Sequence, residues 1–381
     1  MTTMLPTVNP HARSLADVLP DCLASLTAAG GTTLPRVDHA IVILVDGLGA
    51  SNLRARAAYA RFLAPKLTSA STTVSVFPST TAANLASLTT GVWPGGHGLV
   101  SYRARDLRND RVVNQLSGWD DGMRPAEWQR VPTVFERAAS LGVAAHVVGQ
   151  ERYRSSGFTH AVLRGAEYHA GKRIADRLDV ARRIVSQATT PTLTYVYVPE
   201  LDQTAHEYGW ESPRWTAHFE ELDGDVRKWA ERLPARVGAF LTADHGVVDV
   251  PETGQVLFDQ IPALVDGVRH VGGEPRCLHL YQDGEATPAD RLDLAARWNE
   301  AEGHRSWILT REQAIDAGWY GEVSPEVLPR IGDVIVAARK RIAYYDSRPA
   351  DQSSRSMIGQ HGSLTDDERR IPLIPLGAYS R

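Results

Sequence analysis

Short apolar runs recur along the chain and predict buried β-strands. The clearest runs cover residues 40–45, 144–148, 193–198 and 237–242. Runs of this kind are typical of strands in a parallel sheet that helices cover on both faces, because neither face of such a strand meets water. The pattern therefore predicts an α/β core.

The stretches between these runs have helical periodicity, most clearly in residues 212–233. Apolar side chains recur there at spacings of three and four, which places them on one face of a helix: Trp215, Phe219, Leu222, Val226, Trp229 and Leu233. Ser212 is a favourable N-cap, Pro213 suits the first helical position, and Pro234 ends the segment. Alternating strands and helices predict an α/β fold with a doubly wound, mainly parallel sheet, helices on both faces and ligands at the carboxyl ends of the strands.

The pattern changes after Pro251. Residues 255–350 contain shorter strand-like segments around a helical stretch near residues 288–301, which predicts a small α+β insertion. We expect the α/β core to comprise residues 36–254 and 351–381. Residues 1–35 would then form an N-terminal extension.

The composition mainly excludes some classes of function. The 381 residues carry 41 basic and 45 acidic side chains, and the net charge of −4 provides no basic surplus for a nucleic-acid polymer. No glycine-rich turn is followed by Gly-Lys-Ser or Gly-Lys-Thr, which excludes a P-loop. Residues 1–26 lack a basic start followed by an apolar stretch, and the longest aliphatic run is too short for a membrane span. We expect a soluble, cytoplasmic protein.

Four clusters of potential metal ligands lie after predicted strands or after the insertion. They are Asp46; Asp202 with His206; Asp244 with His245; and His361. Because the carboxyl ends of parallel strands share one edge of a sheet, the three carboxylates are expected to converge there. Asp and His without Cys suit Zn²⁺ or another borderline divalent ion. Each cluster alone is compatible with a turn or a surface pair, so only the whole set indicates a metal site.

A hydroxyl-rich segment, residues 77–91, predicts a helix that starts near Pro78 and ends at Gly91. A hydroxyl group at this helix start would lie among free backbone N–H groups, at the positive end of the helix dipole. Such a position is a natural phosphate site. An ordinary helix cap is the alternative interpretation.

Taken in order, these motifs resemble the alkaline phosphatase superfamily and, within it, the type I phosphodiesterase/nucleotide pyrophosphatase family. The resemblance extends over about residues 40–376 and rests on Val45-Asp46-Gly47, the threonine-containing helix start, Thr90-Gly91, Pro94-Gly95-Gly96-His97-Gly98, Asp202 with His206, Asp244-His245-Gly246 and His361-Gly362. It implies an alkaline phosphatase-like fold and a metal-dependent hydrolase of phosphodiester or pyrophosphate bonds. The implied substrate is a small phosphate ester, with nucleotides among the candidates.

The resemblance also implies two Zn²⁺ ions, or other divalent transition metals, and assigns their ligands. Asp46, Asp244, His245 and the nucleophile would hold one ion, and Asp202, His206 and His361 the other. The ions would activate a threonine hydroxyl, which attacks phosphorus and forms a phospho-threonine intermediate.

The family's nucleophile lies nine residues before the Thr of the Thr-Gly motif, which is Thr81 in this chain. Ser79 and Thr80 stay open as alternatives, because the Phe-Pro that follows the family's nucleophile is replaced here. Asn84 matches the family's Asn three residues after the nucleophile, and Tyr102 stands where the family has its phosphate-clamping Asn. Both are expected to contact substrate.

The charge sum of this implied site favours a diester substrate. Two Zn²⁺ ions bring +4, and three aspartates with a Thr81 alkoxide bring −4, so the site is near neutral. A singly charged diester suits that balance better than a dianionic monoester, which needs an extra arginine or a third metal. Arg103 and Arg105 lie near Tyr102 in the sequence and keep that alternative open. Monoester or phosphonate hydrolysis and phosphoryl transfer by a phosphomutase remain alternatives on the same metal site.

Overall fold

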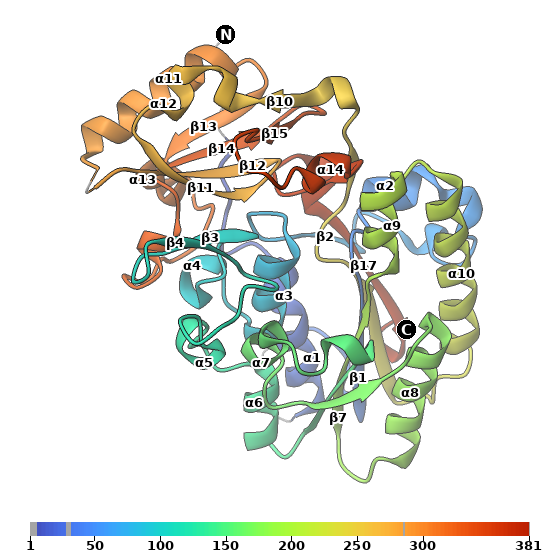
Figure 1. The fold of residues 1–381 in the computed structure, drawn as a ribbon. Helices are drawn as coiled ribbons and strands as arrows, with labels where there is room; N and C mark the ends of the chain where they lie inside the picture. Colours follow the sequence, from blue (N-terminus) through green and yellow to red (C-terminus); the bar gives the residue numbers. More distant parts are fainter. Residues whose placement is uncertain (1–5, 28–31, 285, 381) are drawn as a thin grey trace.

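The central sheet has the predicted mainly parallel architecture (Figure 1). The computed structural model describes residues 6–27, 32–284 and 286–380, and within them seven strands pair in the order β2-β17-β8-β1-β7-β5-β6. The strands are β1 (His39–Val45), β2 (Thr72–Val74), β5 (Ala144–Gly149), β6 (Glu167–Ala170), β7 (Thr192–Val198), β8 (Val237–Thr242) and β17 (Arg370–Gly377). β17 runs antiparallel to both of its neighbours, and the other pairings are parallel.

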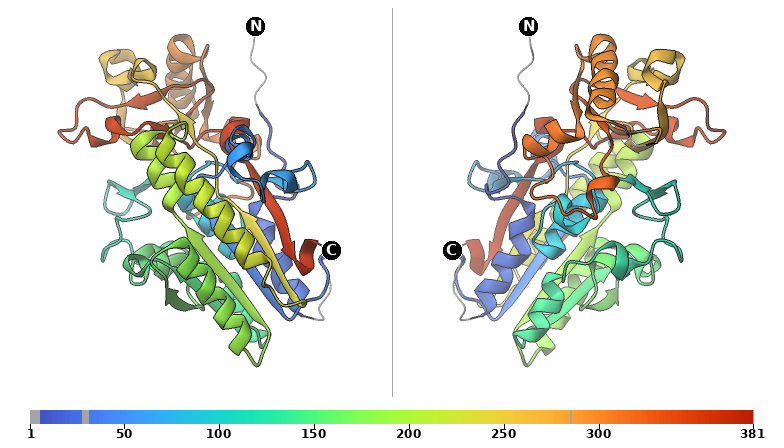
Figure 2. Two further views of the ribbon diagram at one scale, coloured as in Figure 1. Left: turned by 90° about the vertical axis from the view of Figure 1, so that its right-hand side faces the viewer. Right: turned by 90° about the vertical axis from the view of Figure 1, so that its left-hand side faces the viewer.

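Helices cover both faces of this sheet, as the unbroken apolar runs require. Figure 2 shows them on its two sides: α1 (Val18–Leu26) and α6 (Val134–Ser140) on one, α8 (Ile174–Gln187) and α10 (Pro213–Ala230) on the other. β1 lies between β7 and β8, and residues 40–45 are fully buried. The four predicted runs each fall within one of these strands. Among the described residues, no helix has the length and apolar character that a bilayer crossing requires.

The best-defined helix prediction, residues 212–233, is confirmed as α10. The Ser212 hydroxyl caps it by accepting a hydrogen bond from the Trp215 N–H, and Pro213 is its first residue. The predicted apolar face is buried from Trp215 to Trp229 and packs in the main core. The helix ends three residues earlier than expected, so Leu233 packs on that core from the following turn.

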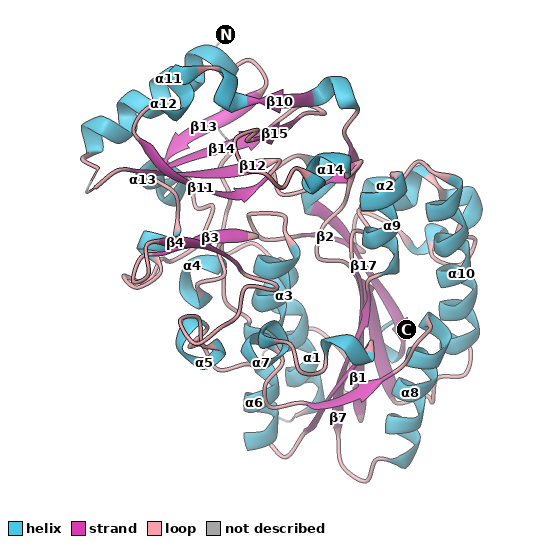
Figure 3. Cartoon of the chain, in the orientation of Figure 1, coloured by secondary structure: helices cyan, strands magenta, loops and turns pink. Residues whose placement is uncertain are grey.

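A second, antiparallel sheet lies beside the first (Figure 3). It is formed by β11 (Val268–Glu274), β12 (Cys277–Gln282), β14 (Val334–Ala338) and β13 (Ser306–Thr310), with α12 (Pro288–Glu302) packed on it. Leu280, Trp298 and Val336 belong to its own apolar cluster. All these elements lie inside the segment expected to be an insertion, whose boundaries at residues 255 and 350 stay a prediction.

The expected N-terminal extension, residues 1–35, is described only in part, since residues 1–5 and 28–31 lie outside the described residues. Its helix α1 packs against the central sheet. Leu19 and Cys22 on this helix belong to the main apolar core. At least this part of the extension therefore contributes to the stability of the α/β core.

Candidate metal and phosphate site

Three buried carboxylates converge at the carboxyl edge of adjacent strands. Asp46 follows β1 directly, Asp244 follows β8 by two residues, and Asp202 lies on α9 (Glu200–Tyr208), just after β7. All three side chains are buried. Because β8, β1 and β7 are neighbours in the sheet, one edge positions all three, which is the usual place for ligands in an open parallel sheet.

Three histidines complete two groups of potential ligands. His245 Nε2 lies 3.4 Å from Asp46 Oδ1 and 3.4 Å from Asp244 Oδ2. Asp202 approaches the other two histidines, with Oδ2 3.2 Å from His206 Nε2 and Oδ1 3.9 Å from His361 Nε2. The His245 and His361 rings stack with centroids 3.7 Å apart, so the two groups adjoin. All six side chains expected to bind metal thus lie together.

Each histidine directs Nε2 into this site because Nδ1 is held by the backbone. The Nδ1 atoms contact carbonyl oxygens at 2.7 Å (His206 to Gly359), 2.8 Å (His361 to Ser79) and 3.2 Å (His245 to Gly246). A carbonyl oxygen only accepts hydrogen bonds, so Nδ1 is the donor in each contact and Nε2 is the nitrogen left to face a cation. This is the arrangement by which proteins orient metal-ligating histidines.

The electrostatics of the site also fit bound cations. Burial, together with Asp244 and Asp202, raises the pKa of Asp46 well above its ordinary value, and burial raises the pKa of Asp244. One oxygen of each carboxylate, Oδ1 of Asp46 and Asp202 and Oδ2 of Asp244, has no hydrogen-bond partner in the described part of the chain. Buried carboxylates with unsatisfied oxygens are costly unless they are neutralised or bind a metal. The donor set of carboxylates and imidazoles therefore suits divalent cations.

Asp202 differs from the other two carboxylates in its protonation. Burial alone would raise its pKa, but the adjacent histidines, His206 first, lower it below the ordinary value. In turn, burial opposes the charged form of His206, but Asp202 raises the pKa of this imidazole. The two shifts have opposite signs because a negative charge on Asp202 and a positive charge on His206 favour one another.

The loops that hold the carboxylates are fixed by residues outside the motifs. Asn52 accepts hydrogen bonds from the N–H groups of Gly49 and Val247 and donates to the Val247 carbonyl, which joins the loops after β1 and β8. Gly47 has a φ of +72° and donates to Asp244, and a Cβ atom there would lie 3.0 Å from Asp202. A glycine is therefore required beside Asp46 on two grounds.

Tyr197 is a site residue that the sequence motifs did not reveal. Its hydroxyl donates a hydrogen bond to Asp46 Oδ2. Its position in β7, two residues after Tyr195, places both tyrosines on one face of the strand that leads to the metal cluster. In the sequence, this placement of Tyr195 and Tyr197 on one face of the predicted strand was the signal that could have revealed Tyr197.

Among the three candidate nucleophiles, Thr81 is the one whose hydroxyl contacts the cluster. It is the first residue of α3 (Thr81–Thr90), and its Oγ1 lies 3.2 Å from His245 Nε2. The Ser79 hydroxyl instead contacts Ser75, 3.2 Å away, and the Thr80 hydroxyl lies against the Glu274 carboxyl. The helix ends as expected at Gly91, whose φ is +71°.

The Asn84 side chain binds the backbone around the start of α3, and its expected contact with substrate stays a prediction. Its amide donates to the carbonyls of Pro78 (3.0 Å) and Thr80 (3.1 Å), and its Oδ1 accepts from the Val76 N–H at 2.8 Å. The side chain is fully buried and holds the loop that leads into Thr81. Tyr102 is half-buried, and its expected contact with substrate stays a prediction.

A cavity of about 450 Å³ adjoins Thr81. Six of the side chains that line it are aromatic: Trp119, Tyr153, Phe158, Tyr168, Tyr195 and Tyr197. This is large enough for a planar ring system, and its aromatic lining favours stacking over ionic recognition. The site thus combines an end formed by Asp, His and Thr side chains with an apolar end.

A mainly parallel α/β sheet with Asp, His and Thr side chains at its carboxyl edge defines an alkaline phosphatase-like fold. The family model of type I phosphodiesterase/nucleotide pyrophosphatase matches residues 40–364. The chain therefore belongs to this family, as its ordered motifs indicated.

Known relatives are consistent with this membership. An uncharacterized pyrophosphatase/phosphodiesterase of Schizosaccharomyces pombe is 25% identical over 240 residues, which cover 58% of this chain and 47% of that protein. The chain thus spans about half the length of this curated relative.

Similar solved structures include ectonucleotide pyrophosphatase/phosphodiesterase 5 from mouse and human. The inactive mouse variant in complex with AMP has a TM-score of 0.63 and 15% identity, and the match covers 88% of this chain and 87% of that one. The human protein has a TM-score of 0.64 and 15% identity, with 89% and 87% covered. At this identity the similarity shows a common fold.

Proposed function

We propose that the protein is a dinuclear zinc hydrolase that cleaves phosphodiester or pyrophosphate bonds through a phospho-threonine intermediate. The observation that carries this proposal is the contact of Thr81 Oγ1 with His245 at 3.2 Å, inside a cluster of three buried carboxylates and three histidines. Family membership supports the same reaction class.

The ligands divide into two groups around the adjoining histidine rings. Asp46, Asp244, His245 and Thr81 would hold one cation, and Asp202, His206 and His361 the other. Divalent cations at these positions would lower the pKa of the Thr81 hydroxyl and neutralise charge on the leaving oxygen. Zn²⁺ is favoured because the donor set is nitrogen and carboxylate oxygen without sulfur, although other borderline ions suit it as well.

The residues of the chain then have defined tasks. Thr81 Oγ attacks phosphorus in line, the bond from phosphorus to the leaving oxygen breaks, and the phosphoryl group is held covalently on Thr81. The N–H groups of the first turn of α3 have no partners within the helix and can donate to a phosphoryl oxygen. Water then cleaves the Thr81–phosphorus bond, so phosphorus is inverted twice and the threonine is regenerated.

The aromatic cavity beside Thr81 supports a substrate with a planar group. A nucleobase would stack on its tyrosine and tryptophan rings while the phosphate faces the metal cluster. The AMP complex of the mouse structural neighbour agrees with a nucleotide substrate. Arg105 shares the Asp110 carboxylate with Arg269 and His270, and Arg103 is exposed. The charge sum of the implied site favours a singly charged diester, and a monoester stays the alternative.

Kinetics with matched substrates and variants test this proposal. Thr81→Ala should lower hydrolysis of a bis-aryl phosphate by about 10³-fold or more while both metals stay bound. Ser79→Ala is the matched control and should retain most of the activity, because its hydroxyl contacts Ser75 rather than the cluster. Near wild-type rates in the Thr81 variant would refute the nucleophile, and faster turnover of an aryl monophosphate would refute the diester preference.

A further inference from the structure

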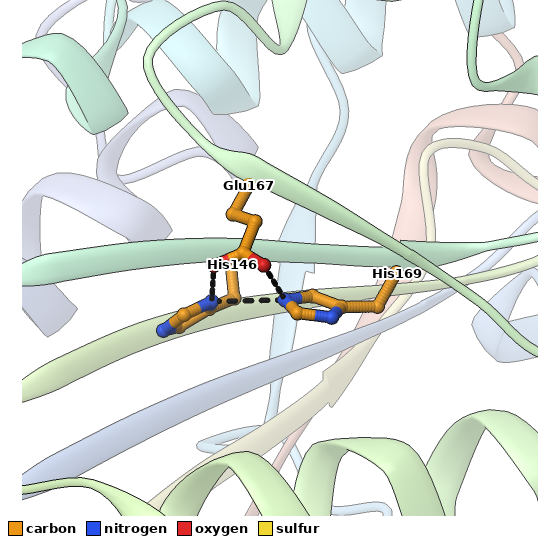
Figure 4. Close-up of side chains that lie close together, drawn as sticks. All are labelled: His146, Glu167 and His169. Carbon is orange, nitrogen blue, oxygen red and sulfur yellow. Dashed lines mark hydrogen bonds and ion pairs between the residues drawn. The ribbon is translucent and has the colours of Figure 1, made fainter.

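A second cluster of metal-binding side chains lies away from the carboxyl edge, on strands β5 and β6. His146 pairs in register with Glu167, and Val148 pairs with His169. Because side chains alternate along a strand, His146, Glu167 and His169 all project from the same face of this strand pair. Figure 4 shows the three side chains directed toward one another.

The distances among the ligand atoms match a coordination polyhedron. His146 Nδ1 lies 3.1 Å from His169 Nε2, and each of these nitrogens lies 3.7 Å from an oxygen of Glu167. In a tetrahedral zinc site with bonds of about 2.0 Å, neighbouring ligand atoms are about 3.3 Å apart. The two 3.7 Å distances run to different oxygens of Glu167, and one donor atom from each of the three residues lies within 4.8 Å of the others. A rotation of the exposed Glu167 carboxylate would therefore bring the three donors around one ion.

We propose that His146, Glu167 and His169 form a second, independent binding site for a divalent transition cation such as Zn²⁺, Co²⁺ or Ni²⁺. Two imidazoles and one carboxylate are the donors that these ions prefer. The Glu167 side chain is 70% exposed, whereas those of His146 and His169 are largely buried. Ions can therefore enter from solvent on the glutamate side, and water completes the coordination.

This site lies behind one wall of the aromatic cavity. Val147 and Tyr168, which line the cavity, alternate in sequence with the cluster residues and thus project from the opposite face of the strands. β6 is the last strand of the central sheet among the described residues and is paired only to β5. A bound cation would cross-link this edge strand to β5 and hold Tyr168 in the cavity wall.

Counting bound metal distinguishes this site from the one around Thr81. Three proteins are dialysed against buffered micromolar Zn²⁺: wild-type protein, His169→Gln and the control His160→Gln. The control changes an exposed histidine on α7 (Gly157–Val162). Elemental analysis should find one ion per chain fewer in His169→Gln than in the other two proteins. The same difference should persist when each protein also carries Asp244→Asn, which makes the result independent of the proposed function.

A second readout guards against misfolding of the histidine variant. Glu167→Gln changes an exposed side chain and should weaken zinc binding at this site without changing the melting temperature in the presence of a chelator. Excess Zn²⁺ should raise the melting temperature of wild-type protein more than that of either variant. Equal ion counts in wild-type protein and in folded His169→Gln would overturn the proposal and leave only a contact between the two imidazole rings.

Discussion

Replacing Glu274 with glutamine should remove a pH-dependent loss of stability. Glu274 ends β11 and is buried beside Thr80 and Gly362, where a Cβ atom on Gly362 would lie 2.5 Å from its Cγ. Burial raises the pKa of this carboxyl from 4.5 to about 8, an effect that the Thr80 hydroxyl opposes and the Glu368 carboxylate reinforces. The protonated, neutral form therefore fits the folded protein best.

The sign and size of the effect follow from this shift. Because the folded-state pKa lies above the unfolded-state value, the stability that Glu274 contributes is fully present below pH 4.5 and is lost as the pH rises through 8. Between these values each pH unit costs about 1.4 kcal/mol, which amounts to about 3 kcal/mol from pH 5 to pH 7.5. Glutamine has the shape of the protonated acid but does not ionise, so the variant lacks this pH-dependent loss of stability.

Urea denaturation of the chelator-treated proteins at pH 5 and pH 7.5 measures this difference. We expect wild-type protein and Glu274→Gln to be similarly stable at the lower pH and the variant to be more stable by about 3 kcal/mol at the higher pH. Glu326→Gln, at an exposed position, is the control and should follow wild-type protein at both values. Equal pH dependence of wild-type protein and Glu274→Gln would show that Glu274 titrates near its ordinary pKa and refute the reasoning.

Three further changes test other parts of the structure. Arg276→Met should lower the free energy of unfolding, measured by urea denaturation, by about 3–5 kcal/mol, because it leaves the Glu368 carboxylate buried without its partner. A second substitution, Glu368→Leu, should restore much of this free energy. Tyr197→Phe should weaken metal affinity by about 10–100-fold in a chelator competition, because Asp46 loses a hydrogen-bond donor. Removing the metal should lower the melting temperature, and this decrease should become larger as the pH rises from about 5 to about 8. The reason is that the pKa of Asp46 is raised, so ionisation of Asp46 destabilises the metal-free protein. A decrease of the same size at every pH would contradict this.

The central sheet was predictable because its strands are buried on both faces. Residues 40–45 and 237–242 consist mainly of apolar side chains, and this composition leaves few alternatives to a covered parallel strand. The α10 boundary was less certain, because Leu233 continues the apolar pattern although the helix ends at Ala230. An apolar residue in a turn can pack on the core just as one in a helix does, so apolar periodicity alone does not mark where the helix ends.

The side chains of the site were predictable where strand ends and ordered motifs both pointed to them. The residues that support them were not, because their roles depend on contacts between distant segments. Asn52 joins two loops nearly two hundred positions apart, and Glu274 reaches Thr80 from the second sheet. Asn84 also depends on such contacts: its buried amide donates to the backbone of the loop before Thr81, which the motif alone did not reveal.

A buried ion pair couples the second sheet to the cluster of Asp and His side chains. Arg276, in the turn between β11 and β12, contacts both oxygens of Glu368 at 2.7 and 2.8 Å. It also donates to the backbone carbonyls of Lys340 and Ile342, in the segment that follows β14. Glu368 in turn accepts from the N–H of Ser363, two residues after His361, and its backbone carbonyl accepts from Gly246, next to His245. Because a buried charge pair tolerates little displacement, the position of the second sheet fixes two of the metal-binding motifs. The predicted insertion is thus a structural support of the site.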